Sequence, residues 1–430
     1  MASMFSNAGE KKVGEQSPKL ACLPETSPPA PYSLFTDNER WGIVALVALA
    51  GWFSTLSSFI YYPAIPVIAN DLGSSVGMID LTVTSYLVVS AIAPAIVGDA
   101  ADTFGRRPLY AITLTLYIAA NIGIALQRSA VALLLLRMLQ SAGISGTFTS
   151  LATSCTFSVA YGVIADISTP SERGAFVSAL SFGITTAPSI GPVIGGAFAS
   201  GPGWRWIFWF LTIASGFCLI AMFLALPETH RAFVGNGGTE PPRLWRPVIK
   251  SIMRPWEGHR GPSTTPQPRR PASVPNPIKC LRILERKDVT ASIMPGSFLY
   301  TVYCCIHASL STIFMQVYGL NKWQAGLIYL PFGIGAILST LVSSKWIDHD
   351  YRVVAKSHKL PIDKVSGDDL LQFPIEEARL KSVFIPTFFA FGSVLTYGWL
   401  VHKQIHLAGP LICLFIAGFS IQTCFNVNQP

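Results

Sequence analysis

A single arginine stands inside a long apolar stretch of this chain. Arg137 follows four consecutive leucines, and Gln140 comes one helical turn after it. A charged side chain within a membrane span costs at least a few kcal/mol and usually lies on a solute pathway or against a buried partner. The alternative is that the side chain snorkels to the membrane surface, but Arg137 lies too far inside the stretch for that. Arg137 is therefore the strongest candidate for a functional charge.

A short segment between two apolar stretches combines one carboxylate with two arginines. It reads Gly98-Asp-Ala-Ala-Asp102-Thr-Phe-Gly105-Arg106-Arg107. The glycines allow the tight turn that joins two spans. A carboxylate at this place can cap a helix N-terminus or pair with arginine. By spacing alone, an ordinary charged turn at the membrane surface is the favoured interpretation of the segment.

A third pattern is rich in glycine. It comprises Gly183 and, eight residues later, the run Gly191-Pro192-Val-Ile-Gly195-Gly196. Gly191 and Gly195 fall on one helix face and permit a neighbouring backbone to approach closely. Pro192 removes a backbone hydrogen bond and favours a bend. Generic helix packing is the simpler interpretation of such a pattern.

The other polar residues of the apolar stretches give weaker signals. His307 lies in the middle of a stretch and could carry protons, although hydrogen bonding to a neighbouring helix is the commoner role. Asn121 and Tyr86 are candidates for facing a cavity, and Asp71 and Asp80 are expected near the outer surface in contact with water. No acidic residue lies in the middle of any stretch, so the proton-carrying group is not evident.

The composition places these residues in a membrane protein. Of the 430 residues, 13% are charged and 50% are hydrophobic, whereas soluble domains carry about 25% charged residues. Disordered, coiled-coil, collagen-like and disulfide-stapled classes are excluded, and a soluble enzyme is disfavoured. A helix needs about 20 apolar residues to cross the bilayer, which predicts ten spans. They are 42–62, 79–97, 109–127, 130–150, 174–199, 206–226, 290–316, 325–344, 382–401 and 407–425.

The distribution of basic residues predicts the orientation and the domains. With the N-terminus in the cytoplasm, 26 of the 31 lysines and arginines lie on the cytoplasmic side, as the positive-inside rule requires. This asymmetry accounts for the net charge of +8 without nucleic acid. We expect a cytoplasmic tail over 1–40, a six-helix bundle over 41–231, a flexible Pro-rich connector over 232–287, and a four-span bundle over 288–430.

The motifs resemble those of the major facilitator superfamily. The family's loop signature, Gly-x-Leu-Ala-Asp-Arg-x-Gly-Arg-Arg/Lys, is matched at Gly98, Ala101, Asp102, Gly105, Arg106 and Arg107. The family's Arg-x-x-Gln-Gly is matched at Arg137 and Gln140, with Ser141 in place of glycine. The glycine-rich run is similar to the family's antiporter signature, which is found in exporters.

Further segments resemble the fungal drug:proton antiporters with twelve spans. They are Tyr61–Pro66, Trp204–Phe208 and Leu226–Arg231. A fourth, Lys345–Arg352, looks like a degenerate copy of the first-half loop, as an internal repeat would produce. The resemblance implies an all-α fold of two pseudo-symmetric helical bundles around a central cavity.

The resemblance also implies a function. It is proton-coupled efflux of small organic compounds by alternating access, driven by the proton gradient without a cofactor, metal or catalytic reaction. Asp102, Arg106 and Arg107 would hold the cytoplasmic gate, Arg137 would couple to protons with His307 as a weaker candidate, and the antiporter signature would let helices slide. The expected partners are the lipid bilayer, the substrate and protons, in a monomer of the plasma membrane or, alternatively, the vacuolar membrane.

Two departures from the family leave alternatives open. The chain ends after its tenth predicted span, so the C-terminal bundle is expected to be incomplete. The interval from Arg137 to Glu172 is longer than the family's, with the surplus around Thr147–Val159. An altered gene model or a lengthened helix would explain this surplus. An uptake carrier of the same fold and a truncated, non-transporting membrane protein are the alternative functions.

Overall fold

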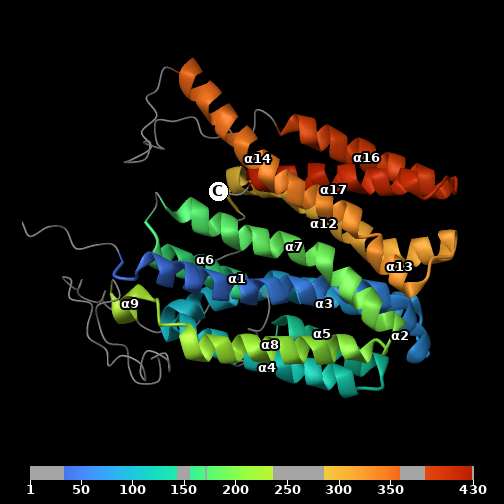
Figure 1. Cartoon of the computed structure of the whole chain (residues 1–430), viewed down its shortest axis with the longest axis horizontal. Coiled ribbons are helices and arrows are strands. Elements are labelled where there is room, and N and C mark those ends of the chain that lie inside the picture. Colours follow the sequence, from blue (N-terminus) through green and yellow to red (C-terminus); the bar gives the residue numbers. More distant parts are fainter. Residues whose placement is uncertain (1–32, 143–154, 170–171, 236–284, 359–382, 429–430) are drawn as a thin grey trace, which may run out of the picture.

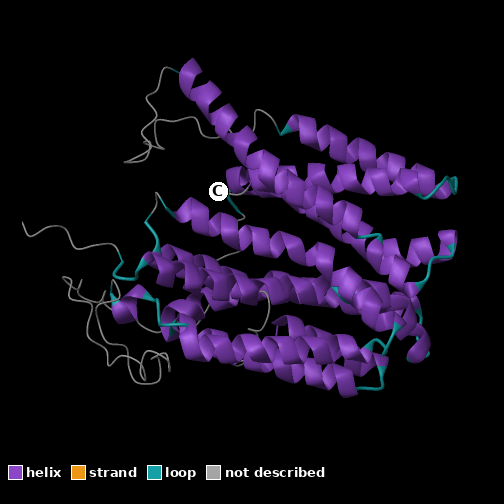
Figure 2. Ribbon diagram, in the orientation of Figure 1, coloured by secondary structure: helices purple, strands orange, loops and turns teal. Residues whose placement is uncertain are grey.

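The computed structural model describes residues 33–142, 155–169, 172–235, 285–358 and 383–428. Within these ranges the chain forms helices joined by short loops and no strand (Figure 2). The elements, labelled as in Figure 1, are α1 (Asp37–Phe59), η1 (Tyr62–Ala64), α2 (Ile65–Asp71), α3 (Val76–Phe104), α4 (Arg106–Leu126), α5 (Ala130–Ala142), α6 (Cys155–Ile167), α7 (Arg173–Ser200), α8 (Arg205–Ala225), α9 (Arg231–Val234), α12 (Lys287–Tyr318), α13 (Lys322–Leu327), α14 (Leu330–Ser357), α16 (Phe384–His402) and α17 (Ala408–Asn428).

The predicted spans correspond to these helices. Among the described residues, eight helical stretches are long and apolar enough to cross a membrane. Two shorter apolar helices, Val76–Ile92 and Ala130–Ser141, occupy the places of the second and fourth predicted spans. The apolar residues that predicted the spans therefore form the helices of a multi-pass membrane protein.

The first span is longer than predicted. It begins with a capping box, in which the Thr36 hydroxyl accepts a hydrogen bond from the Glu39 amide and the Glu39 carboxylate accepts one from the Thr36 amide. The helix was expected to end near residue 62. It continues instead through η1 and α2 as far as Asp71, because Pro63 and Pro66 fall at first-turn positions where no amide hydrogen is needed.

The fourth predicted span, 130–150, is described only as far as residue 142. α5 ends at Ala142 and a second helix, α6, covers Cys155–Ile167, where a loop was expected. Residues 143–154, which include most of the sequence surplus, lie outside the described residues. α5 and α6 both pack against α3 and α4. The two helices therefore share the same neighbours within the N-terminal half.

The predicted loop over Lys345–Arg352 is also wrong, because these residues belong to the last turns of α14. The segment contains no glycine or proline to end a helix, so the helix continues beyond its apolar part to Ser357. Most of the connector 232–287 lies outside the described residues.

The helices form two halves. The N-terminal half comprises α1–α9, in which α1 packs against α6, α7 and α8, and α4 packs against α5 and α8. The C-terminal half comprises α12–α17, in which α17 packs between α14 and α16. The halves meet where α7 contacts α13 and α14, and where η1 contacts α12 and α13. In Figure 1 the contacts with α13 and η1 lie at the end of the molecule opposite to α9.

The C-terminal half is held together by close backbone contacts. Gly335 of α14 lies against Phe415 and Phe419 of α17, and Gly418 of α17 lies against Phe332 of α14. A Cβ atom at Gly418 would lie 3.0 Å from the Phe332 Cα and still closer to its carbonyl group. Only glycine permits this approach, which brings the two backbones together over a long stretch.

We expect Gly418→Ala to lower the apparent Tm of the purified protein by about 5 °C, since overpacking typically costs about 1–3 kcal/mol. The measurement is thermal unfolding in detergent followed by tryptophan fluorescence. Gly392→Ala is the matched control, because no atom lies within 4 Å of a Cβ at that position of α16. Equal Tm values for the two variants would contradict the packing assignment.

Candidate functional site

Arg137 lies completely buried at the centre of the N-terminal half, with no exposed surface. Its Nη1 donates to the Ser57 carbonyl of α1 (3.3 Å) and to the Gln140 side chain (2.7 Å). The guanidinium carbon lies 4.4 Å from the ring centre of Tyr61 and 4.5 Å from that of Tyr86. Two aromatic faces therefore hold the cation, an interaction worth about 2 kcal/mol each when water is absent.

A chain of hydrogen bonds extends from Arg137 into α4. The Gln140 amide donates to the Asn121 side-chain oxygen (2.8 Å), and the Asn121 amide donates to the Tyr117 carbonyl (2.8 Å). The Tyr117 hydroxyl in turn contacts the Ser57 hydroxyl on α1. Residues of α1, α3, α4 and α5 thus share one buried network, which we call the Arg137 cluster.

Among the described residues, the Arg137 cluster contains no acid that would neutralise the arginine. Among the residues whose side chains the structure describes, no carboxylate forms an ion pair with Arg137. Its Nε and Nη2 atoms are buried without a hydrogen-bond partner. Arginine keeps its proton in proteins, so the cluster holds a permanent positive charge with free donor capacity.

The structure also shows the surroundings of three of the weaker candidates. Asn121 and Tyr86, which were candidates for facing a cavity, are buried in the Arg137 cluster. Asp71 is exposed, in keeping with the expected contact with water, and it also has protein partners. Its carboxylate accepts a hydrogen bond from the Trp204 indole (2.9 Å) and lies 3.4 Å from the Arg205 guanidinium. It ties α2 to the start of α8.

The two arginines of the loop motif are held by a residue that sequence reasoning did not select. Glu228, which follows α8, is buried and accepts hydrogen bonds from the backbone amides of Arg106 (3.0 Å) and Arg107 (3.2 Å). These are the first amides of α4, so Glu228 caps this helix and faces the positive end of its dipole. Gly105 enters the helix with φ 95°, a conformation that favours glycine.

A second carboxylate holds the Arg106 side chain. Asp166 of α6 lies 3.2 Å from the Arg106 Nε, and both side chains are nearly buried. The Arg231 side chain donates to the Asp166 carbonyl (3.0 Å), and the Arg107 side chain donates to the Phe223 carbonyl (2.7 Å). Together with the Glu228 cap, these contacts connect α4, α6, α8 and α9 at one end of the N-terminal half. We call this group the terminal clasp.

The terminal clasp contains the two kinds of contact that were expected of Asp102, made here by other residues, and the roles of Asp102 itself stay predictions. Glu228 caps the helix, and Asp166 pairs with an arginine. Gly98 and Asp102 lie in the last turns of α3, and their side-chain surroundings are outside what the structure describes. The signal that could have identified Glu228 is its place in the segment Leu226–Arg231, which the sequence matched to the family without assigning a role.

The glycine-rich run of α7 lies between α1 and the C-terminal half. A Cβ at Gly191 would lie 3.1 Å from the Ile60 amide, and one at Gly195 would collide with the Ile60 carbonyl. Gly196 faces the other way, since its Cβ would lie 3.0 Å from the Cα of Gly326 in α13. At this point the two halves therefore meet backbone against backbone.

The remaining residues of the run contribute differently. The Pro192 carbonyl faces Gly326. A Cβ atom at Gly326 would lie 2.6 Å from the Pro192 carbonyl oxygen. Gly183 lies in ordinary contact with Ala48 at 3.8 Å and does not require glycine for space. The structure thus places the close approach at the end of α7 that lies nearest α13.

His307 belongs to a separate cluster at the boundary between the halves. Its Nδ1 bonds to the Tyr303 carbonyl (2.9 Å), and the Tyr329 hydroxyl donates to the His307 carbonyl (2.8 Å). Aromatic rings surround its imidazole, including Phe59 of α1 and Phe332 of α14. His307 and Arg137 are therefore not brought together, although Phe59 and Tyr61, one in each cluster, are close in sequence.

This fold and these motifs place the chain in a known family of membrane transporters. Residues 47–428 match the Major Facilitator Superfamily, and the chain belongs to this family. It is similar to the MFS-type transporter phiD of Fungal sp. (strain ATCC 74256), with 38% identity over 93% of this chain and 59% of the relative. It is also similar to tstD of Talaromyces stipitatus, with 36% identity over 98% of this chain and 76% of the relative.

Another relative carries a substrate in its name. Citrate exporter 1 of Aspergillus niger is 32% identical over 97% of this chain and 78% of its own length. Among solved structures, the E. coli xylose transporter XylE in a partially occluded inward-open conformation shares the fold. Its TM-score is 0.58 at 14% identity, over 90% of this chain and 85% of XylE.

We expect Glu228→Gln to lower the free energy of unfolding by about 2 kcal/mol. The first amides of α4 would then face a neutral acceptor in place of a charged one. The measurement is reversible unfolding of the detergent-solubilised protein by SDS. The matched control is Glu172→Gln, which removes an exposed partner of Arg40 and should cost little. A smaller effect at Glu228 than at Glu172 would contradict the cap.

We expect Gly196→Val to force α7 away from Gly326 and to widen the contact between the halves at that end. Spin labels at Gly77 and Trp323 would report this as a shift of the measured distance distribution to longer values. Gly174→Val is the control within the same helix, since no atom lies within 4 Å of its Cβ position. An unchanged distribution for Gly196→Val would show that this contact does not hold the halves together.

Proposed function

We propose that this protein exports small organic molecules in exchange for protons by alternating access. The observation that carries the proposal is the backbone contact between the halves, where Gly196 of α7 meets Gly326 of α13 without intervening side chains. Such a smooth contact lets one half rock against the other at low steric cost. It lies at one end of the molecule, so it would be made in one state and broken in the other.

Rocking requires each half to move as a unit, and the clusters described above supply that rigidity. The Arg137 cluster joins four helices of the N-terminal half, and the terminal clasp joins four elements at one end. Close glycine contacts join α14 to α17 in the C-terminal half. Rigid halves with a smooth contact between them favour rigid-body motion over local unfolding.

Proton coupling would involve Arg137. As a permanent buried cation with two unpaired nitrogen atoms, it would stabilise a bound anion or a deprotonated group in one state more than in the other. Such differential affinity is what couples two binding events. His307 is the second candidate, because its imidazole packs against rings from both halves and would respond to their separation.

Two observations favour export. The run Gly191-Pro192-x-x-Gly195-Gly196 resembles the signature of exporters, and it occupies the contact surface between the halves. The relative from Aspergillus niger is named a citrate exporter. Export is a proposal for this chain, and uptake by the same fold is the alternative that the experiment below tests.

The distribution of charges supports a proposed orientation. The N-terminus and the terminal clasp would face the cytoplasm, in keeping with the excess of lysine and arginine on that side. Residues 232–287 would connect the halves within the cytoplasm. We place the protein in the plasma membrane as a monomer, and place the contact between Gly196 and Gly326 on the outer side.

The test is transport by the purified protein in liposomes that contain a pH-sensitive dye. An imposed pH step should drive movement of substrate and protons in opposite directions, and Arg137→Ala should slow the coupled flux by roughly 100-fold, since about 3 kcal/mol of buried contacts are lost. Arg137→Lys should not restore the flux, because lysine lacks the planar fork.

The control for this experiment is Arg128→Ala, which removes an exposed arginine just before α5 and should leave the flux unchanged. Movement of substrate and protons in the same direction would identify an uptake carrier. No flux in any variant, with a folded protein, would refute transport altogether.

A further inference from the structure

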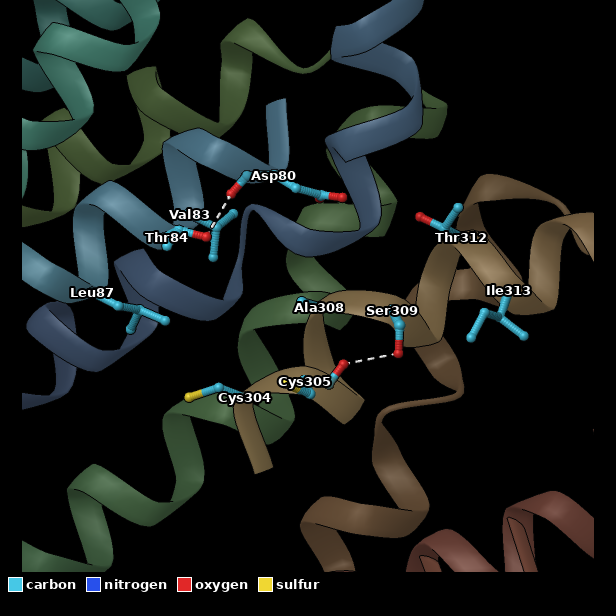
Figure 3. A pocket seen from close by; sticks show the side chains of 10 residues that line it. All are labelled: Asp80, Val83, Thr84, Leu87, Cys304, Cys305, Ala308, Ser309, Thr312 and Ile313. Atoms are coloured by element: carbon cyan, nitrogen blue, oxygen red, sulfur yellow. Dashed lines mark hydrogen bonds between the residues drawn. The ribbon is translucent and has the colours of Figure 1, made fainter. Parts of the chain in front are cut away.

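A pocket lies between the halves on the side formed by α3 and α12. Its volume is about 380 Å³, which is within the range of sites for small organic ligands. Figure 3 shows that Asp80, Val83, Thr84 and Leu87 line it from α3, and that residues from Cys304 to Ile313 line it from α12. Because one wall belongs to each half, the pocket would change shape whenever the halves rock.

The only charge lining this pocket, among the residues that the structure describes, is the carboxylate of Asp80. No described basic side chain forms an ion pair with Asp80. Asp71, the other acid of this region, is by contrast paired with Arg205. A carboxylate beside a largely aliphatic wall is therefore left without a cation from the described protein.

Two hydroxyl groups of the pocket can accept a hydrogen bond from a ligand but have already used their own hydrogen. The Thr84 hydroxyl donates to the Asp80 carbonyl (3.3 Å), and the Ser309 hydroxyl donates to the Cys305 carbonyl (2.8 Å), as the dashed lines in Figure 3 mark. Their donors are thus used within their own helices, and what remains for a ligand is lone pairs. Thr312 supplies the one hydroxyl whose hydrogen is not committed in this way.

We propose that this pocket binds an organic cation with an apolar body, and that Asp80 is the residue that selects its charge. The proposal rests on the transport function proposed above and names its substrate class. The Asp80 carboxylate and the oxygens of Thr84 and Ser309 would surround the positive group, while the aliphatic side chains would contact the apolar body. An organic anion would meet a like charge and almost no donor there, so a tricarboxylate of the citrate kind does not fit.

The experiment measures equilibrium binding to the purified full chain in detergent, with no pH gradient. The probe is radiolabelled tetraphenylphosphonium, and the comparison ligand is tetraphenylborate, which has nearly the same shape and the opposite charge. We expect the wild type to bind the cation at least about 10-fold more tightly than the anion, which corresponds to about 1.4 kcal/mol.

The variants locate the site. Asp80→Asn should weaken binding of the cation by about 10-fold or more and remove the preference for the cation over the anion. Asp80→Glu should keep both the affinity for the cation and this preference. Ser309→Phe, which keeps the charge and fills the pocket, should abolish binding of both ions. The matched control is Asp71→Asn, which alters a carboxylate outside the pocket and should leave the preference unchanged.

The outcomes separate this proposal from the transport proposal. Equal cation binding by Asp80→Asn and the wild type, or displacement of the cation by citrate, would overturn the assignment of Asp80 even if the liposomes transport protons and substrate. Binding that depends on Asp80, without flux in the liposome experiment, would support the pocket and refute transport. Every variant is compared with the wild type by thermal unfolding, so that loss of fold is recognised separately.

Discussion

The structure of the N-terminal half depends on the burial of one positive charge. Arg137 has no accessible surface and no carboxylate partner among the described side chains. Two aromatic rings, a backbone carbonyl and a glutamine hold it in place. An isolated charge in a low-dielectric interior is expensive unless such groups are positioned around it. Helices α1, α3, α4 and α5 must therefore keep a fixed arrangement as long as Arg137 stays buried.

Three described acids of the half lie near the ends of its helices, where they fix the chain rather than a ligand. Glu228 caps α4, Asp166 holds Arg106, and Asp71 holds Arg205. Each pair connects elements that are far apart in sequence. The N-terminal half is thus constrained both at its centre and at its two ends, and deformation of the half would break several of these contacts at once.

The contact between the halves has the opposite character. It includes glycine backbones on α7 and α13, aromatic rings around His307, a hydrogen bond from the Ser311 hydroxyl to the Tyr62 carbonyl, and a pocket between α3 and α12. Described ion pairs lie within the N-terminal half or within one helix of the C-terminal half, and none crosses the boundary. Stiff halves and a boundary with few directional bonds are the physical conditions for rigid-body rocking. In such a boundary, a pocket with one uncompensated carboxylate is a natural place for a cationic ligand.

The sequence by itself determined the class of the protein and the spans. Apolar length alone predicts a membrane-crossing helix, and the described helices and the family match agree with that prediction. Local composition also singled out Arg137, because a lone charge among leucines is visible without knowledge of any partner. It did not predict helix α6, which overlaps the surplus of residues, or the end of α14, where polar residues continue a helix that was expected to stop.

Only the tertiary structure decided which residues act together. Glu228 lies more than a hundred positions from Arg106 in sequence, and no local pattern predicts that its carboxylate caps α4. Asp166 and Asp80 were likewise ordinary acids until packing placed one against an arginine and left the other in a pocket without a cation. The physical reason is that hydrophobic periodicity acts over a few turns of one helix, whereas the partner of a charge is set by which helices lie side by side.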